Sequence, residues 1–170
     1  MLIAMAGLPG SGKSHLAARL ADELGVPVVS VDPIEAAMWR AGVGGPGDPL
    51  PTGLAAYVVA EAIAEENLRA GRSLIIDAVN AVEPARGQWR ELATRTGVPL
   101  RFIETVCPDP ETHHSRLAGR RRDIAGFVEP TWEDVVARYY AAWVDDHLTV
   151  DTTDDDAATL RRTLGYLQEP

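Results

Sequence analysis

The residue types best suited to chemistry stand near the N-terminus, in the segment Gly7-Leu8-Pro9-Gly10-Ser11-Gly12-Lys13-Ser14. This segment matches the pattern G-x-x-x-x-G-K-[ST] completely. In that pattern backbone N–H groups cradle phosphates, the lysine reaches the β- and γ-phosphates, and the hydroxyl binds Mg²⁺. Lys13 is the only lysine of the chain, which otherwise uses arginine. Because an ammonium is a point charge and a guanidinium a planar fork, this usage favours a phosphate site. The residues predicted to bind nucleotide here are Gly7, Leu8, Pro9, Gly10, Ser11, Gly12, Lys13, Ser14 and His15.

The flanking sequence supplies the two elements that such a loop requires. Residues 2–6 form a short apolar run suited to a buried parallel strand, and residues 14–24 carry apolar side chains at helical spacing. A glycine loop that opens a helix is a ready anion site, because free N–H groups point out of the helix N-terminus. The alternative is a chance glycine-rich turn, and the strand and helix on either side argue against it.

Two aspartates follow other predicted strands. Asp32 comes directly after the run 26–31, and Asp77 ends the run 73–77. At the rim of a phosphate site, one carboxylate can accept the proton of an acceptor hydroxyl, and the other can hold the metal directly or through water. We expect the first role, general base, for Asp32 and the second, with Ser14, for Asp77. The alternative for Asp32 is a helix N-cap.

A short basic patch follows the helix predicted after residue 109. Arg116 and Arg120 are spaced i,i+4, so they share one helical face. Phosphoryl transfer is catalysed mainly by positioning and charge neutralisation, and in a chain without a second lysine the further cations are arginines. We therefore predict a lid over about residues 116–130 that could hinge at Gly126. The alternative is a solvated charged face. The predicted lid residues are Arg116, Arg120, Arg121 and Arg122.

Strand and helix signals alternate along the rest of the chain. Further strands are expected at 100–106 and 147–150, and helices at about 33–41, 53–70, 84–96, 110–120, 131–143 and 155–168. This order predicts a three-layer α/β/α fold with a mainly parallel five-stranded sheet, in which ligands bind at the carboxyl ends of the strands.

Composition predicts one domain spanning residues 1–170 and limits the class of partner. The chain is 46% hydrophobic, which is enough for a core, and Cys107 is its only cysteine, so no disulfide forms within it. No apolar run approaches the length of a membrane span, and we expect a cytoplasmic protein. A net charge of −9 makes nucleic acid an unlikely partner, because such binding uses a broad basic face. Oligomeric state stays open.

Taken together, these motifs resemble the P-loop kinases of the nucleoside-monophosphate-kinase-like superfamily. More closely, the chain is similar to AAA-type bacterial ATP-binding proteins related to polynucleotide kinase, zeta toxin and chloramphenicol phosphotransferase. The resemblance rests on the phosphate loop, Asp32, the segment Asp77-Ala78-Val79-Asn80 and the arginine-rich lid. It implies a P-loop NTPase fold, Mg²⁺ and ATP as cofactors, Asp32 as the general base, and lid arginines that contact phosphates or adenine. Adenine is also expected near residues 151–154.

The acceptor site is expected between the helix after Asp32 and the glycine- and proline-rich loop 42–53. Polynucleotide kinases typically carry an arginine one turn after the aspartate, where this chain has Glu35. Glu35 would repel an acceptor phosphate, which favours an acceptor that is uncharged or cationic there; equally, it could be a surface glutamate. Trp39, Tyr57 and Asn80 complete the predicted acceptor pocket, although an aromatic residue at helical spacing can also be core.

These observations predict a small-molecule kinase that transfers the γ-phosphoryl of Mg-ATP to a hydroxyl acceptor. ATP is favoured over GTP because GTPases of the superfamily commonly read guanine through N-K-x-D, and the single lysine of this chain lies in the phosphate loop. Two alternatives remain open: a regulatory ATPase switch, and a polynucleotide 5′-hydroxyl kinase, against which the acidic charge and Glu35 count.

Overall fold

A five-stranded parallel sheet forms the centre of the computed structural model, which describes residues 1–120 and 124–169. The spatial order of the strands is β2-β3-β1-β4-β5, and every neighbouring pair is parallel. The strands are β1 (Leu2–Ala6), β2 (Val28–Ser30), β3 (Leu74–Asp77), β4 (Leu100–Val106) and β5 (His147–Asp151). The predicted three-layer fold with a parallel sheet is confirmed.

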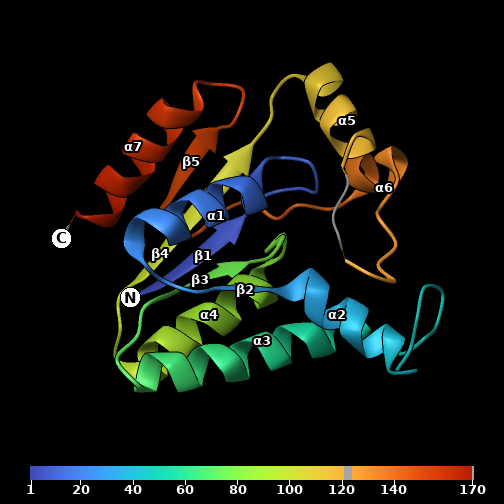
Figure 1. Ribbon diagram of the computed structural model, residues 1–170, viewed down its shortest axis with the longest axis horizontal. Coiled ribbons are helices and arrows are strands. Elements are labelled where there is room, and N and C mark those ends of the chain that lie inside the picture. Colours follow the sequence, from blue (N-terminus) through green and yellow to red (C-terminus); the bar gives the residue numbers. More distant parts are fainter. Residues whose placement is uncertain (121–123, 170) are drawn as a thin grey trace.

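Helices cover both faces of this sheet (Figure 1). One face carries α1 (Lys13–Leu24) and α7 (Asp156–Leu167), and the other carries α3 (Thr52–Arg69) and α4 (Glu83–Thr96). The helices α5 (Pro110–Ala118) and α6 (Trp132–Ala137) lie near the end toward which the strands point, and α2 (Val31–Arg40) follows directly from β2. The carboxyl ends of the strands therefore face the segments predicted to bind ligands.

The central strand shows why the sequence folds into these layers. All five residues of β1 are buried, which matches its continuous apolar run. Successive side chains of a strand point to opposite faces: Leu2 and Ala4 join the core under α3 and α4, whereas Ile3 and Met5 join the core under α1 and α7. Burial on both faces fixes the strand that leads into the phosphate loop.

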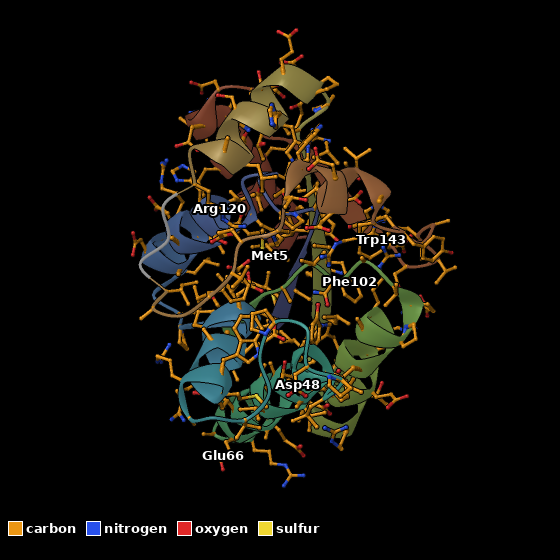
Figure 2. All side chains as sticks on the ribbon, turned by 90° about the vertical axis from the view of Figure 1, so that its right-hand side faces the viewer. Met5, Asp48, Glu66, Phe102, Arg120 and Trp143 are labelled. Carbon is orange, nitrogen blue, oxygen red and sulfur yellow. The ribbon has the colours of Figure 1, made fainter. Side chains whose placement is uncertain are left out.

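The helix predicted over residues 131–143 ends at Ala137 in the structure. It begins with a capping box between Thr131 and Asp134. Beyond it the backbone is used in other ways, since Ala141 N donates to Ala81 O and Trp143 packs edge-on against Phe102 at 5.4 Å (Figure 2). The prediction was wrong here because long-range contacts outweigh the helical propensity of the local sequence.

A fully buried arginine of α4 holds this extended segment. Arg86 is 0% exposed, and its guanidinium lies 3.6 Å from the ring centroid of Trp143. Its Nε donates to Asn80 O at 2.9 Å, while Nη1 and Nη2 donate to Ala142 O and Ala141 O at 3.1 Å. Carbonyl oxygens and an aromatic face thus take the place of a carboxylate partner. Arg86 joins the loop after β3 to the chain that leads into β5.

Replacing Arg86 with Gln should lower the free energy of unfolding by about 3 kcal/mol, because buried carbonyls lose donors that each contribute on the order of 1 kcal/mol or more. Urea denaturation followed by circular dichroism measures the change. Arg162→Gln, at an exposed position of α7, is the matched control and should shift stability by less than about 0.5 kcal/mol. Equal effects of the two substitutions would contradict the role assigned to Arg86.

Candidate functional site

The phosphate loop approaches β4 too closely for any side chain at its first glycine. A Cβ on Gly7 would lie 2.4 Å from Thr105 O, and the φ of Gly7 is +134°, which only glycine adopts readily. Gly7 N donates to Val79 O at 3.1 Å, so the loop also touches the segment after β3. The start of the loop is therefore fixed against the ends of both strands that flank β1.

Two side chains outside the motif support the loop from below. The hydroxyls of Ser11 and Thr105 lie 2.7 Å apart, and Thr105 Oγ1 also donates to Ala6 O at 3.2 Å. From α5, the ring of His113 reaches the carbonyl of Pro9, with Nε2 and O 2.8 Å apart. Because Ser11, Thr105 and His113 are all buried, these contacts hold the loop in one conformation.

Lys13 and Ser14 are the first two residues of α1, and the N-terminus of a helix favours an anion. Lys13 is 5% exposed and lines a cavity of about 350 Å³ beside the loop. Arg116 and Arg120 line the same cavity, and Figure 2 shows Arg120 close to α1. The other lining residues are Gly10, Gly12, Ser14, His15, Leu16, Thr152, Asp154, Asp156 and Thr159. The phosphate loop, two predicted lid arginines and the loop after β5 therefore meet around one cavity.

Thr152 connects three parts of this cavity. Its hydroxyl donates to Ser11 O at 2.9 Å and accepts from Arg116 Nη1 at 2.8 Å, while its carbonyl accepts from Arg116 Nη2 at 2.9 Å. Thr152 N donates to Val106 O at 2.9 Å. The guanidinium of Arg116 thus fixes the segment after β5 against the phosphate loop, in the region where sequence reasoning expected adenine.

His15 lies at the exposed side of the cavity. Its Nε2 is 3.0 Å from Asp156 Oδ1, and the same carboxylate forms an ion pair with Arg19. These contacts join the first turns of α1 to the start of α7. His15 remains a predicted nucleotide contact.

Asp32 and Asp77 lie at the ends of neighbouring strands. The register pairs Ser30 with Asp77, and Ser30 Oγ donates to Asp77 Oδ2 at 3.3 Å. Asp77 is 8% exposed. Asp32 stands in the first turn of α2, which begins one residue earlier, at Val31, with Ser30 in the cap position. The N-cap interpretation of Asp32 is therefore wrong, whereas its role as general base stays a prediction.

Glu35 and Trp39 belong to a hydrogen-bonded chain with the first residue of α3. Trp39 Nε1 donates to Thr52 Oγ1 at 2.9 Å, and Thr52 Oγ1 donates to Glu35 Oε1 at 2.8 Å. The indole of Trp39 also stacks on Phe127 at 5.5 Å between centroids. These residues thus connect α2 to the start of α3 on one side and to Phe127 of the predicted lid on the other.

Tyr57 and Asn80 meet at the loop after β3. Asn80 N donates to the Tyr57 hydroxyl at 3.1 Å, and burial raises the pKa of Tyr57 to about 12, so the phenol stays protonated at neutral pH. The Asn80 side chain is 0% exposed: Nδ2 donates to Met5 O and Oδ1 accepts from Trp89 Nε1. Its φ is +48°. Asn80 therefore shapes the loop, and both ends of its amide are occupied by protein.

The predicted lid contacts α2 as well as the nucleotide cavity. Arg120 Nη1 lies 3.3 Å from Glu129 Oε2, and Arg40 Nη1 donates to Ala125 O at 2.6 Å. Arg121 and Arg122 lie outside the described residues. Arg120 thus lies at the phosphate-loop cavity, and Ala125 lies against α2, on the side where the acceptor was expected.

Sequence reasoning missed Thr105 and His113, which support the loop from strand β4 and helix α5. A threonine in a strand and a histidine in a helix carry no motif, so nothing in the local sequence could have revealed them. Thr152 falls inside the expected adenine segment, although its bridging contacts were not foreseen. In the described ranges 1–120 and 124–169, no cluster of three His, Cys, Asp or Glu side chains is placed to hold a metal.

Mg²⁺ nevertheless fits the oxygen donors at this site. Mg²⁺ keeps several waters and is usually bound through one or two protein oxygens together with substrate phosphates. The Ser14 hydroxyl lines the phosphate-loop cavity, and the nearly buried Asp77 carboxylate ends β3, the strand next to β1, so both are oxygens of the kind that Mg²⁺ prefers. A dedicated protein cage is not required for this mode of binding.

The described helices include none long and apolar enough to cross a lipid bilayer.

A family model described as an AAA domain matches residues 2–142. The chain belongs to this AAA-domain family. A UPF0200 protein of Aeropyrum pernix is 32% identical over 145 residues, which cover 78% of this chain and 70% of that protein.

Solved structures share the fold over nearly the whole chain. A candidate kinase from Chloroflexus aurantiacus matches with a TM-score of 0.78 and 23% identity, covering 98% of both chains. Kti12 of Chaetomium thermophilum, solved with ADP-AlF3, matches with a TM-score of 0.72 and 21% identity, covering 98% of this chain and 97% of that one. The fold is therefore that of the P-loop kinase-like superfamily, as the sequence predicted.

Replacing Thr152 with Val should weaken ATP binding about fivefold to tenfold. The side chain keeps its shape but loses the hydroxyl that joins Arg116 to the phosphate loop, at a cost of about 1 kcal/mol. Titration calorimetry with Mg-ATP measures the affinity. Thr153→Val is the control: Thr153 is exposed and its hydroxyl contacts only Asp151 among the described residues. Similar affinities for both variants would show that the Thr152 contacts do not order the site.

Proposed function

We propose that this protein is a kinase that transfers the γ-phosphoryl group of Mg-ATP to a hydroxyl of a small molecule. The observation that carries the proposal is the arrangement around Lys13: a phosphate-loop cavity lies on one side, and the carboxylates of Asp32 and Asp77 stand at the ends of β2 and β3, the two strands on one side of β1. A hydrolase needs only a water beside the phosphate, whereas this site has a general-base candidate on the helix that borders the loop 42–51.

In the proposed reaction the acceptor oxygen attacks the γ-phosphorus while the bond from that phosphorus to the β,γ-bridging oxygen breaks. The hydroxyl proton passes to the Asp32 carboxylate, and ADP leaves with the electron pair of the broken bond. Lys13 and the backbone N–H groups of residues 10–14 stabilise the charge on the β- and γ-phosphate oxygens. Arg120 lines the cavity with them and adds a further positive charge.

The Ser14 hydroxyl and the Asp77 carboxylate would hold Mg²⁺, which supplies charge neutralisation between the β- and γ-phosphates. Asp77 is oriented by Ser30 Oγ. Arg116 is proposed to act indirectly. Its guanidinium is hydrogen-bonded to Thr152 and so positions the wall of the nucleotide site. The proposed donor is ATP, whose adenine would contact the loop after β5.

Fold relatives support phosphoryl transfer to a small molecule. A sugar kinase from Janibacter matches with a TM-score of 0.73 and 20% identity over 98% of this chain. The phosphate-loop motif and the carboxylates at the strand ends support the proposed reaction more strongly than this likeness of fold does.

The proposal is tested by measuring ADP release across a panel of hydroxyl compounds: sugars, nucleosides, hydroxylated antibiotics and a 5′-hydroxyl oligonucleotide. An acceptor that stimulates ADP release and appears as a phosphorylated product by mass spectrometry supports a kinase and names its acceptor class. ADP release that no compound stimulates, together with nucleotide-dependent binding of a protein, would favour the regulatory switch instead.

Asp32→Asn should lower acceptor-dependent turnover about 10²- to 10⁴-fold, the usual contribution of a general base, while leaving Mg-ATP affinity within about twofold. Asp22→Asn removes the same charge from an exposed position of α1 and should leave turnover unchanged. Steady-state ADP release and ATP titration give the two readings. Unchanged turnover in Asp32→Asn would remove the general-base role.

Lys13→Ala should abolish turnover and weaken Mg-ATP binding at least tenfold, because a nearly buried ammonium facing the phosphates is lost. EDTA should stop turnover, and Ser14→Ala should raise the Mg²⁺ concentration that restores it. Turnover that persists in EDTA would contradict the metal-dependent mechanism.

A further inference from the structure

A second cavity, of about 340 Å³, lies between α3, the start of α4 and the segment after α6. Its volume is at the lower end of the range for small-molecule sites, about 300–1,000 Å³. Four apolar side chains, Leu54, Val79, Val82 and Ala85, form much of its lining. Gln88 and Tyr57 add polar groups, and Gln88 Nε2 donates to Tyr57 O at 3.0 Å, which fixes this wall.

This cavity adjoins the proposed reaction site through the loop after β3. Val79 lines it, and Val79 O accepts the hydrogen bond from Gly7 N at the start of the phosphate loop. Tyr57 lines it as well, and the charges of both Asp32 and Asp77 act on the Tyr57 hydroxyl. A molecule bound here could therefore direct a hydroxyl toward the general base and the γ-phosphate.

Arg138 is the charged residue among the described residues that line this cavity. It is exposed and takes no part in the ion pairs that the described residues form. The carboxylate of Asp134, one turn earlier, accepts hydrogen bonds from Thr131 N and Thr131 Oγ1; these bonds, and to a smaller extent the charge of Arg138, lower the pKa of Asp134. A guanidinium at an apolar cavity fits an anionic group, which it can bind through two parallel hydrogen bonds.

The segment that carries Arg138 is held to the same loop. Ala141 N donates to Ala81 O at 2.8 Å, and buried Arg86 donates to the carbonyls of Ala141 and Ala142. The backbone beside Arg138 is therefore fixed relative to the wall formed by Val79 and Ala81. A positioned cation also matters in a chain of net charge −9, which repels anions in general.

We propose that this cavity binds the phosphoryl acceptor, that the acceptor is a small hydroxy compound with an apolar body and an acidic group, carboxylate or phosphate, and that Arg138 recognises that group. The inference rests on the proposed function and names its substrate class. It replaces the expectation of an uncharged or cationic acceptor, which depended on Glu35. The Glu35 carboxylate accepts a hydrogen bond from Thr52 and is not among the residues that line this cavity.

Binding without ATP tests the inference separately from catalysis. The probes are para-hydroxymethylbenzoate, the corresponding phosphonate and the neutral carboxamide, followed by saturation-transfer NMR and tryptophan fluorescence. The full-length wild-type protein should bind at least one of the anions about tenfold more tightly than the carboxamide. The stronger anion identifies which acidic group is recognised. Equal binding of all three probes, or no binding of either anion, would overturn the proposal.

Four variants test where the anion is recognised. Arg138→Gln should remove the preference for the anion, and Arg138→Lys should restore part of it. Arg161→Gln, which removes an exposed arginine of α7, should keep the preference. Ala85→Phe should weaken both anion and amide by filling the cavity without changing charge. A preference that survives in Arg138→Gln, or probe binding that is unaffected by Ala85→Phe, would place the anion elsewhere.

ADP release with the same compounds then separates the two proposals. If the wild type binds the anion with the expected preference but no panel compound is phosphorylated, the kinase proposal fails while the anion site stands. If acceptor-dependent turnover is found only with neutral or cationic compounds, the kinase proposal stands and the anion site is wrong.

Discussion

The close approach of Gly7 to β4 is the contact on which the nucleotide site depends. A Cβ at this position would lie only 2.4 Å from Thr105 O, so only glycine allows the chain to turn there. The turn directs the following residues across the ends of the strands. The contacts of Ser11, Thr105 and His113 then hold the loop before any ligand binds. Such preorganisation matters because phosphoryl transfer depends mainly on positioning and charge. The conformation of the loop therefore depends on contacts with β4 and α5, which lie 94 and 104 residues away in sequence.

A second set of contacts joins the proposed acceptor side to the same loop. Gly7 N binds Val79 O, Asn80 binds Met5 O and Tyr57, and Arg86 connects Asn80 to the chain after α6. The buried charge of Arg86 is met by carbonyl oxygens and by the face of Trp143. This arrangement explains how Arg138, far from the phosphate loop in sequence, comes to line a cavity beside it. It also fixes one wall of the cavity proposed for the acceptor.

The long loop and the predicted lid form the opposite flank. Trp39 stacks on Phe127, and Arg40 binds Ala125 O, so α2 contacts the segment after α5. Glu35 and Thr52 hold α2 to the start of α3. Arg120 lines the nucleotide cavity, while Ala125 and Phe127 contact α2, the helix that carries Asp32. Described residues that follow α5 therefore lie both beside the nucleotide cavity and against the helix of the proposed general base.

The sequence by itself determined the fold class, the strand-loop-helix of the phosphate site and the placement of Asp32 and Asp77 at strand ends. These follow from local rules: apolar runs form buried parallel strands, glycines permit the loop, and parallel strands end at one edge. Only the tertiary structure decided that the helix after residue 131 stops at Ala137, that the Asn80 side chain fixes the loop after β3 to Met5, and that Arg138 borders a cavity. Each of these depends on partners distant in sequence, such as Ala81, Met5 and Arg86, whose contacts outweigh local propensity and leave no periodic signal.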